Sequence, residues 1–168
     1  MLSGSNAWSK LDSPQRKAWV ESRWIQIRTS IRGKKCMNTG YHRYVGMNAR
    51  LRLMGFQPRD WPPGAPCSFT LRAFKAAQNP HSVLLTWQPD APPTPGRYFL
   101  EIWRQRAPRP GRKPDPYHAV ILAYAPLEDE EYLDTTAQAG QFTYWARPID
   151  STSGDFSPHL TDTIFLTP

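Results

Sequence analysis

The amino-acid sequence predicts an α+β protein with two domains, a small basic α-helical module over residues 1–60 and an all-β sandwich over residues 68–168. Apolar residues recur at helical spacing in the first part, and short segments of alternating polarity, separated by turns, make up the second. The positive charge is concentrated in the first part. Seven residues each of Trp, Tyr and Phe argue for a packed core rather than disorder, despite 18 prolines.

A first helix is predicted to begin at Ser13 and Pro14 and to end at Gly33. Serine caps the free amide groups at a helix start, and proline suits the first helical position. Glycine is the usual residue just past a helix end. The apolar stripe of this helix is expected to consist of Val20, Trp24, Ile27 and Ile31.

A second helix is predicted from about residue 40 to Met54, with Gly55 as its left-handed stop. Because each predicted helix has one apolar face, the two faces are expected to pack on each other. The apolar face of the second helix consists of Tyr44, Met47, Leu51 and Met54.

Charge is distributed unevenly along the chain. Residues 1–60 hold twelve Lys and Arg residues against three acidic ones, a net charge of +9, whereas residues 61–168 have a net charge of −2. Basic side chains that neutralise phosphates release condensed counterions, so the module is predicted to bind RNA or DNA without reading its sequence. An acidic partner or a glycan surface is the alternative. The candidate phosphate contacts are Arg16, Lys17, Arg23, Arg28, Lys34, Lys35, Arg43, Arg50 and Arg52.

Two aromatic residues of the module, Trp19 and Tyr41, would stack on unpaired bases if their rings were exposed. The alternative is that both rings belong to the core of the module. Tyr44 lies on the predicted apolar face and is expected in that core.

Residues 61–67 are predicted to form a proline-rich joint, because four prolines between residues 56 and 66 favour stiff, extended backbone. Extended segments follow it. They are expected at about 69–74, 82–87, 97–105, 118–124, 132–137, from residue 140 onward, and at 161–167.

The segment from Gly140 to Pro158 organises the second domain. Phe142, Tyr144 and Ala146 alternate with more polar neighbours, which is the period of two expected for a strand with one buried face. Tyr144 stands at the position of the tyrosine in a tyrosine corner. Its ring is therefore expected to pack inside the sandwich, and its hydroxyl is expected to form a hydrogen bond with the backbone upstream.

On these residues the segment from Ser68 to Pro168 resembles a fibronectin type III domain. The stretch 83–87 corresponds to the family's second strand with its core tryptophan, Trp87, and residues 98–103 correspond to the third strand. The resemblance covers about 100 residues and implies an immunoglobulin-like sandwich. It implies little about function, because this architecture serves adhesion, receptors, enzyme accessory modules and virion decoration.

A shorter resemblance concerns the segments 6–11 and 13–19, in which a tryptophan is followed by a serine-started basic helix. This order is similar to the middle of an HMG box. The likeness covers about 15 residues and agrees with a nucleic-acid partner.

Two loops of the second domain carry opposite charge. Residues 104–113 are rich in arginine, and Arg109, Arg112 and Lys113 form a second candidate patch for nucleic acid. Residues 128–134 are acidic. If the loops lie at opposite ends of the sandwich, subunits would associate head to tail, and such a contact builds a filament when it does not close. The alternative is that both loops are simply solvated.

No catalytic motif was found, and the four histidines are scattered, so neither an enzymatic activity nor a cofactor is expected. Cys36 and Cys67 either form one disulfide or remain unpaired. Neither has a second ligand at zinc spacing, so no metal site is expected.

Three functions remain open on these observations: a polyanion-binding protein, a self-assembling filament or coat subunit, and an extracellular adhesion or carbohydrate-associated module. A subunit that assembles through its sandwich and contacts nucleic acid through its helices combines the first two. The first residues lack a signal peptide's charged and hydrophobic regions, and no apolar run reaches the roughly 20 residues of a membrane span. Both a cytoplasmic location and a virion or cell-surface location stay compatible with the sequence.

Overall fold

The computed structural model describes residues 4–22, 27–29, 35–37, 39–65, 67–107 and 113–167. The chain divides into two compact units. The N-terminal unit comprises Met1–Pro66 together with Thr152–Asp155, and the β-sandwich unit comprises Cys67–Ser151 together with Phe156–Pro168. Within the described ranges, no helix is long and apolar enough to cross a bilayer.

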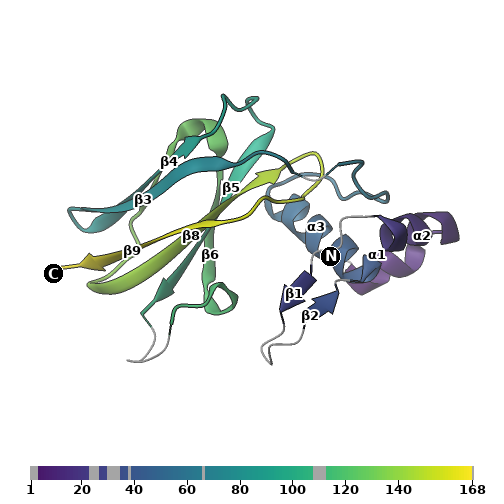
Figure 1. Ribbon diagram of the computed structural model, residues 1–168, viewed down its shortest axis with the longest axis horizontal. Coiled ribbons are helices and arrows are strands. Elements are labelled where there is room, and N and C mark those ends of the chain that lie inside the picture. The colour runs from purple at the N-terminus through teal and green to yellow at the C-terminus, as the bar shows by residue number, and fades with distance from the viewer. Residues whose placement is uncertain are drawn as a thin grey trace. The chain divides into compact units, whose positions relative to one another are not determined.

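The described part of the N-terminal unit consists of helices and a two-stranded antiparallel sheet (Figure 1). In the sheet, Ile27 lies opposite Met37. The elements, in chain order, are α1 (Gly4–Lys10), α2 (Ser13–Glu21), β1 (Ile27–Thr29), β2 (Lys35–Met37) and α3 (Gly40–Leu53).

The prediction of one continuous helix from Ser13 to Gly33 is wrong, because α2 ends at Glu21 and Ile27–Thr29 form a strand. Strand β1 occupies part of the range, in keeping with the β-branched side chains of Ile27 and Thr29. Val20 of the predicted stripe is 62% exposed, and the neighbouring Trp19 is buried instead. Trp24, Ile31 and the side chain of Ile27 lie outside the described residues. The apolar spacing was compatible with a helix but did not require one.

Side-chain caps determine where α2 and α3 begin. Asp12, rather than Ser13, caps α2: its Oδ1 accepts from the amide of Gln15 at 2.7 Å, and Gln15 Oε1 accepts from the amide of Asp12 at 2.8 Å. Thr39 caps α3 by accepting from the amide of His42 at 3.3 Å. Gly55 has a φ of +85° and ends α3 as predicted.

The core of the N-terminal unit lies between the three helices. Tyr44, Met47 and Leu51 are each no more than 3% exposed, which confirms three of the four residues predicted for the apolar face of α3. The fourth, Met54, is half-buried and caps the end of the helix. The Trp19 ring meets the Tyr44 ring edge-on, with centroids 5.5 Å apart. Leu11 of the α1–α2 connection is buried in the same cluster.

Gly40, the first residue of α3, allows α3 to approach the backbone of α2 closely. A Cβ at this position would lie 2.8 Å from both the Trp19 carbonyl carbon and the Val20 amide nitrogen. Backbone atoms cannot yield as a flexible side chain does, so we expect Gly40→Ala to separate the helices and destabilise the unit by about 1 to 3 kcal/mol. Urea unfolding followed by circular dichroism at the helical band measures the change.

Gly46, also in α3, offers a matched control. A Cβ there would meet only the end of the flexible Arg50 side chain, 3.7 Å away. Because alanine is the better helix former, Gly46→Ala is expected to be neutral or stabilising by up to about 1 kcal/mol. Equal stability of the two variants would show that Gly40 is not needed for close packing.

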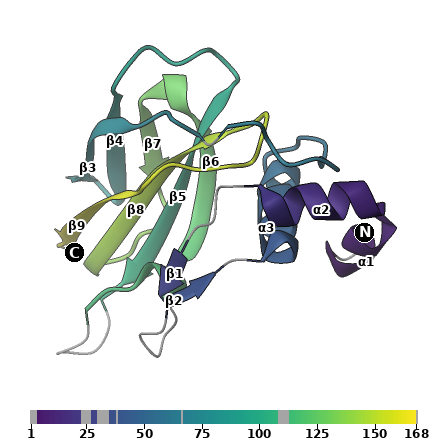
Figure 2. The same cartoon turned by 45° about the vertical axis from the view of Figure 1, so that its right-hand side comes forward.

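The described part of the β-sandwich unit contains seven strands in two antiparallel sheets (Figures 1 and 2). The three-stranded sheet has the order β3-β4-β7 and the four-stranded sheet the order β6-β5-β8-β9. Each of the predicted extended segments overlaps one of these strands. Their bounds are β3 (Leu71–Asn79), β4 (Ser82–Pro89), β5 (Tyr98–Arg106), β6 (Val120–Pro126), β7 (Glu131–Asp134), β8 (Gly140–Asp150) and β9 (Leu160–Leu166).

One apolar core joins the two sheets, the arrangement of a β-sandwich. Val83 and Leu85 of β4, together with Leu100 and Ile102 of β5, are completely buried in it. Trp87 is 2% exposed, and its ring N–H donates to the carbonyl of Leu127 at 2.9 Å. Leu127 begins the short 3-10 helix η2 (Leu127–Asp129) that leads from β6 to β7.

Strand β6 runs from one end of the sandwich to the other. Val120 at its start pairs with Arg104 near the end of β5, and Pro126 at its end pairs with Phe99 near the start of β5. The connection before β6 and the acidic turn after it therefore lie at opposite ends of the four-stranded sheet.

Candidate nucleic-acid interface

Three of the candidate phosphate contacts are exposed on helices of the N-terminal unit. Arg16 and Lys17 are on α2, and Arg52 is in the last turn of α3. Lys17 Nζ lies 3.7 Å from Glu21 Oε1, one turn further along α2. Because both groups are well exposed, this pair contributes little stability and leaves the ammonium accessible to another anion.

Arg43 and Arg50, in contrast, are engaged within the N-terminal unit. Arg43 is 8% exposed, and its Nη1 donates to the Ser22 carbonyl at 2.9 Å and to the Ser22 hydroxyl. Burial lowers the pKa of Arg43, partly offset by the charge of Asp155. Arg50 Nε donates to the Gly154 carbonyl at 2.9 Å. The Arg43 guanidinium holds the end of α2 against α3, which corrects its assignment as an exposed phosphate contact.

Trp19 does not meet the condition for base stacking. Its ring is 1% exposed, and its N–H donates to the carbonyl of Asp60 at 2.7 Å. The core alternative therefore holds for Trp19, as it does for Tyr44. Tyr41 is half-buried, and its ring contacts Trp8 edge-on at 5.7 Å.

Several candidates lie outside what the structure describes. The side chains of Arg23, Arg28, Lys34 and Lys35 belong to this group, and so do Arg109 and Arg112 of the second patch. Lys113, the remaining member of that patch, is exposed.

The proposed Cys36–Cys67 disulfide cannot be followed in the structure, because the Cys36 side chain also lies outside the described residues. Cys67 is 8% exposed, and the hydroxyl of Ser157 lies 3.4 Å from its sulfur. Within the described ranges, no group of three or more His, Cys, Asp and Glu side chains is arranged to hold a metal ion.

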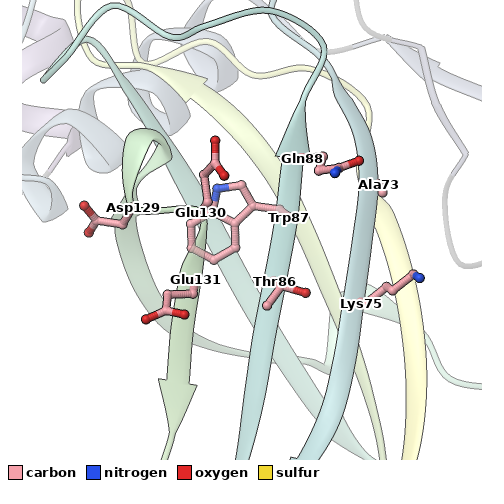
Figure 3. A pocket seen from close by; sticks show the side chains of 8 residues that line it. All are labelled: Ala73, Lys75, Thr86, Trp87, Gln88, Asp129, Glu130 and Glu131. Carbon is pink, nitrogen blue, oxygen red and sulfur yellow. The ribbon is translucent and has the colours of Figure 1, made fainter.

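An open hollow of about 560 Å³ lies beside the acidic turn of the β-sandwich unit. Figure 3 shows the carboxylates of Asp129 and Glu131 on one side of it and the Lys75 ammonium on the other. Thr86 and Gln88 of β4 lie between them. The three acidic residues 129–131 outnumber the one lysine, so the hollow favours a cationic group.

A second hollow, of about 540 Å³, lies at the opposite end of the sandwich, where Arg104, Arg106 and His118 line it. Arg104 Nη1 is 2.5 Å from Asp134 Oδ2, so that charge is balanced internally. Arg106 is exposed and donates a long hydrogen bond, 3.5 Å, to the Ala139 carbonyl. Among the described residues, the exposed Arg106 and Lys113 lie at the opposite end of the sandwich from residues 128–131, but Asp134, the last residue of the predicted acidic loop, contacts Arg104. The condition that the two charged loops lie at opposite ends is therefore met in part only.

Two buried ion pairs of the sandwich were missed by the sequence reasoning. Glu101 and Arg147 face each other across β5 and β8, and Arg104 contacts Asp134. A signal was present for the first pair, because Glu101 stands between Leu100 and Ile102, Arg147 stands between Ala146 and Pro148, and opposite charges in neighbouring strands often pair. The cross-strand register that brings them together was not available from the sequence.

In comparisons with known proteins, no family model, no curated protein and no solved structure matches the chain.

Proposed function

We propose that this chain is a non-enzymatic binding and assembly protein that contacts nucleic acid through its N-terminal unit. The observation that carries the proposal is the exposure of Arg16, Lys17 and Arg52 on a unit whose first sixty residues have a net charge of +9. Phosphate neutralisation by such side chains requires no base readout, so the expected binding is tight at low salt and insensitive to sequence.

The interface is smaller than the sequence alone suggested. Arg43 is withdrawn into the unit, Arg50 is bonded to a backbone carbonyl, and Trp19 has no accessible ring face. Tyr41 is the remaining aromatic candidate, with part of its ring accessible. The proposed contact is therefore mainly electrostatic, made by cations on the surfaces of α2 and α3.

We further propose that the β-sandwich unit is a fibronectin type III-like module that contributes protein contacts. The proposal is supported by the division of its strands into β3-β4-β7 and β6-β5-β8-β9, antiparallel throughout, and by the buried positions of Trp87 and Tyr144. One departure from the family's pattern is the partner of Tyr144: its hydroxyl donates to the Asp134 carboxylate at 2.8 Å rather than to backbone upstream.

Binding to a single-stranded RNA and to a DNA duplex of equal length, followed by fluorescence anisotropy between about 50 and 200 mM salt, tests the nucleic-acid proposal. The variant Arg16→Gln/Arg52→Gln is expected to bind both more weakly. Since each lost phosphate contact reduces the slope of log K against log salt by about 0.9 on duplex DNA, the slope should fall by about 2.

Lys75→Gln, an exposed lysine of β3, is the control and should leave affinity and slope unchanged. A wild-type protein that binds neither polymer would overturn the nucleic-acid proposal and leave the adhesion module as the better candidate. An unchanged slope in the double variant would remove Arg16 and Arg52 from the interface.

A further inference from the structure

Strand β6 presents an apolar, uncharged outer edge. It is the last strand in the order β6-β5-β8-β9, and within the described part of the chain only β5 pairs with it. Its sequence, VILAYAP, contains no charged residue, and its single proline stands at the last position. Val120 and Ile121 at its start are 66% and 43% exposed. Such an edge is a template for pairing with another strand.

Two of the other described strand edges, those of β7 and β3, carry features that discourage pairing, and the fourth edge strand, β9, contains the charged Asp162. Strand β7 has only four residues and includes the carboxylates of Glu131 and Asp134. Beside β3, Asp162 of β9 accepts a hydrogen bond from the amide of Ala76 at 2.8 Å and so satisfies an edge donor. Short length, charge and blocked donors are among the usual protections of sheet edges. Strand β6 has none of these three before Pro126, and its one irregularity is a shift of its register with β5 between Ile121 and Ala123.

The charges at the two ends of β6 have opposite sign. Exposed cations, Lys113 and Arg106, lie near its start, and the exposed carboxylates of Asp129 and Glu130 follow its end. When two copies of one strand pair antiparallel, the start of each lies beside the end of the other. At each end of the paired strands, the cationic end of one copy then faces the acidic end of the other. Parallel pairing would instead bring like charges together.

We propose that the β6 edge is the self-association site of this chain, at which β6 of a second copy pairs antiparallel about a two-fold axis. The contact is isologous and closes as a dimer, joining two four-stranded sheets into one sheet of eight strands. The inference rests on the assembly part of the proposed function and names its partner and its edge. It replaces an open head-to-tail filament with a closed pair.

Sedimentation velocity of the full chain tests the proposal. The wild type is expected to sediment with twice the mass of one chain at low salt, and Val120→Lys with the mass of a single chain. Val120 is largely exposed, so the lysine does not disturb the core. Leu133→Lys, at a 44% exposed apolar position of the β7 edge, is the matched control and should remain dimeric. Circular dichroism verifies that both variants are folded.

Charge reversal tests the orientation of the pair. Asp129→Lys/Glu130→Lys should weaken the dimer at least tenfold at low salt, and adding Arg106→Glu/Lys113→Glu in the same chain should restore it. A Val120→Lys variant that stays dimeric, a Leu133→Lys variant that dissociates equally, or a charge swap that fails to restore association overturns the β6 proposal.

The outcomes also separate this inference from the function on which it rests. If the assemblies of the wild type persist in Val120→Lys, the proposal that β6 is the contact is wrong, whereas the proposal that the chain self-assembles is retained. A wild type that is monomeric at every concentration would overturn both. Nucleic-acid binding is measured separately through Arg16 and Arg52, and a monomeric Val120→Lys that still binds RNA supports both proposals.

Discussion

Replacement of Arg147 by methionine is expected to lower the free energy of unfolding by about 3 to 5 kcal/mol. Glu101 is 2% exposed, and its Oε2 lies 2.6 Å from Arg147 Nη2 and 2.7 Å from Nε. Methionine fills much of the same volume but leaves a buried carboxylate without its counter-charge. That uncompensated charge, rather than the loss of attraction itself, causes the large effect.

Stacking adds to the role of Arg147. Its guanidinium lies over the Phe156 ring, 3.6 Å from the centroid, and over the Trp103 ring at 4.4 Å. Lysine retains the charge but has neither the planar group nor the two donors directed at Glu101. Arg147→Lys should therefore be intermediate in stability between the wild type and Arg147→Met.

Urea unfolding followed by tryptophan fluorescence measures these effects. The control is Arg147→Met combined with Glu101→Gln, which removes both charges and keeps an acceptor for Tyr124, whose hydroxyl donates to Glu101 Oε1 at 2.6 Å. The double variant should be more stable than the sum of the two single changes implies. Strict additivity would show that Glu101 and Arg147 are not energetically coupled.

The second large effect is expected at Asp134, where Asp134→Ala should destabilise the sandwich by about 3 to 5 kcal/mol. The carboxylate is 2% exposed and accepts from Tyr144 Oη at 2.8 Å and from Thr136 Oγ1 at 2.7 Å, besides its contact with Arg104. Alanine leaves the Tyr144 hydroxyl and the Arg104 guanidinium without this acceptor. Tyr144→Phe removes one hydrogen bond and is expected to destabilise by only about 1 to 2 kcal/mol.

The same site makes stability depend on acid. Burial alone would raise the pKa of Asp134, but hydrogen bonds from Thr136 and Tyr144 and the charge of Arg104 outweigh it and hold the pKa below its ordinary value of 3.8. The unfolded chain therefore binds a proton at higher pH than the folded chain. The stabilisation by Asp134 is fully present above the pKa that this residue has in the unfolded chain. It is lost as the pH falls through the lower pKa of Asp134 in the folded chain.

Unfolding free energies measured from pH 6 down to about pH 2 test this linkage. The wild type should lose stability steeply below about pH 4, and Asp134→Asn should show a shallower loss over the same interval. An identical pH profile in both proteins would mean that Asp134 titrates alike in the folded and unfolded chains. At the alkaline end, burial and Asp134 raise the pKa of Tyr144, so its hydroxyl stays protonated in the folded state.

Strand positions were largely predictable because alternation is a local property. Phe142, Tyr144 and Ala146 alternate with their neighbours whatever their partners are, and the structure buries all three. It also buries the intervening Thr143 and Trp145, so the expectation that only one face of this strand is buried is wrong. The α3 helix was predictable for the same reason, since its apolar face and Gly55 stop lie within sixteen residues. The prediction of a helix through Ile27 failed because the spacing of the apolar residues there is compatible with a helix and with a short strand alike. Only the pairing of β1 with β2 decides for the strand.

The candidate interface was less predictable, because exposure is a property of the folded chain. Arg43 and Arg52 are equivalent by composition and belong to the same helix, yet Arg43 is buried against Ser22 and Arg52 is exposed. The sequence left two roles open for Trp19, stacking on bases and packing in the core. Its contacts with Tyr44 and Asp60 show that it packs in the core.

By itself, the sequence determined the uneven charge, the alternation of the strands, the turns and the glycine stop of α3, all of which depend on residues close together in the chain. Only the tertiary structure decided that Glu101 meets Arg147, that Asp134 meets Arg104, and that the acidic and basic ends of β6 lie apart. These features depend on cross-strand register and on desolvation, which are produced by contacts between residues distant in sequence.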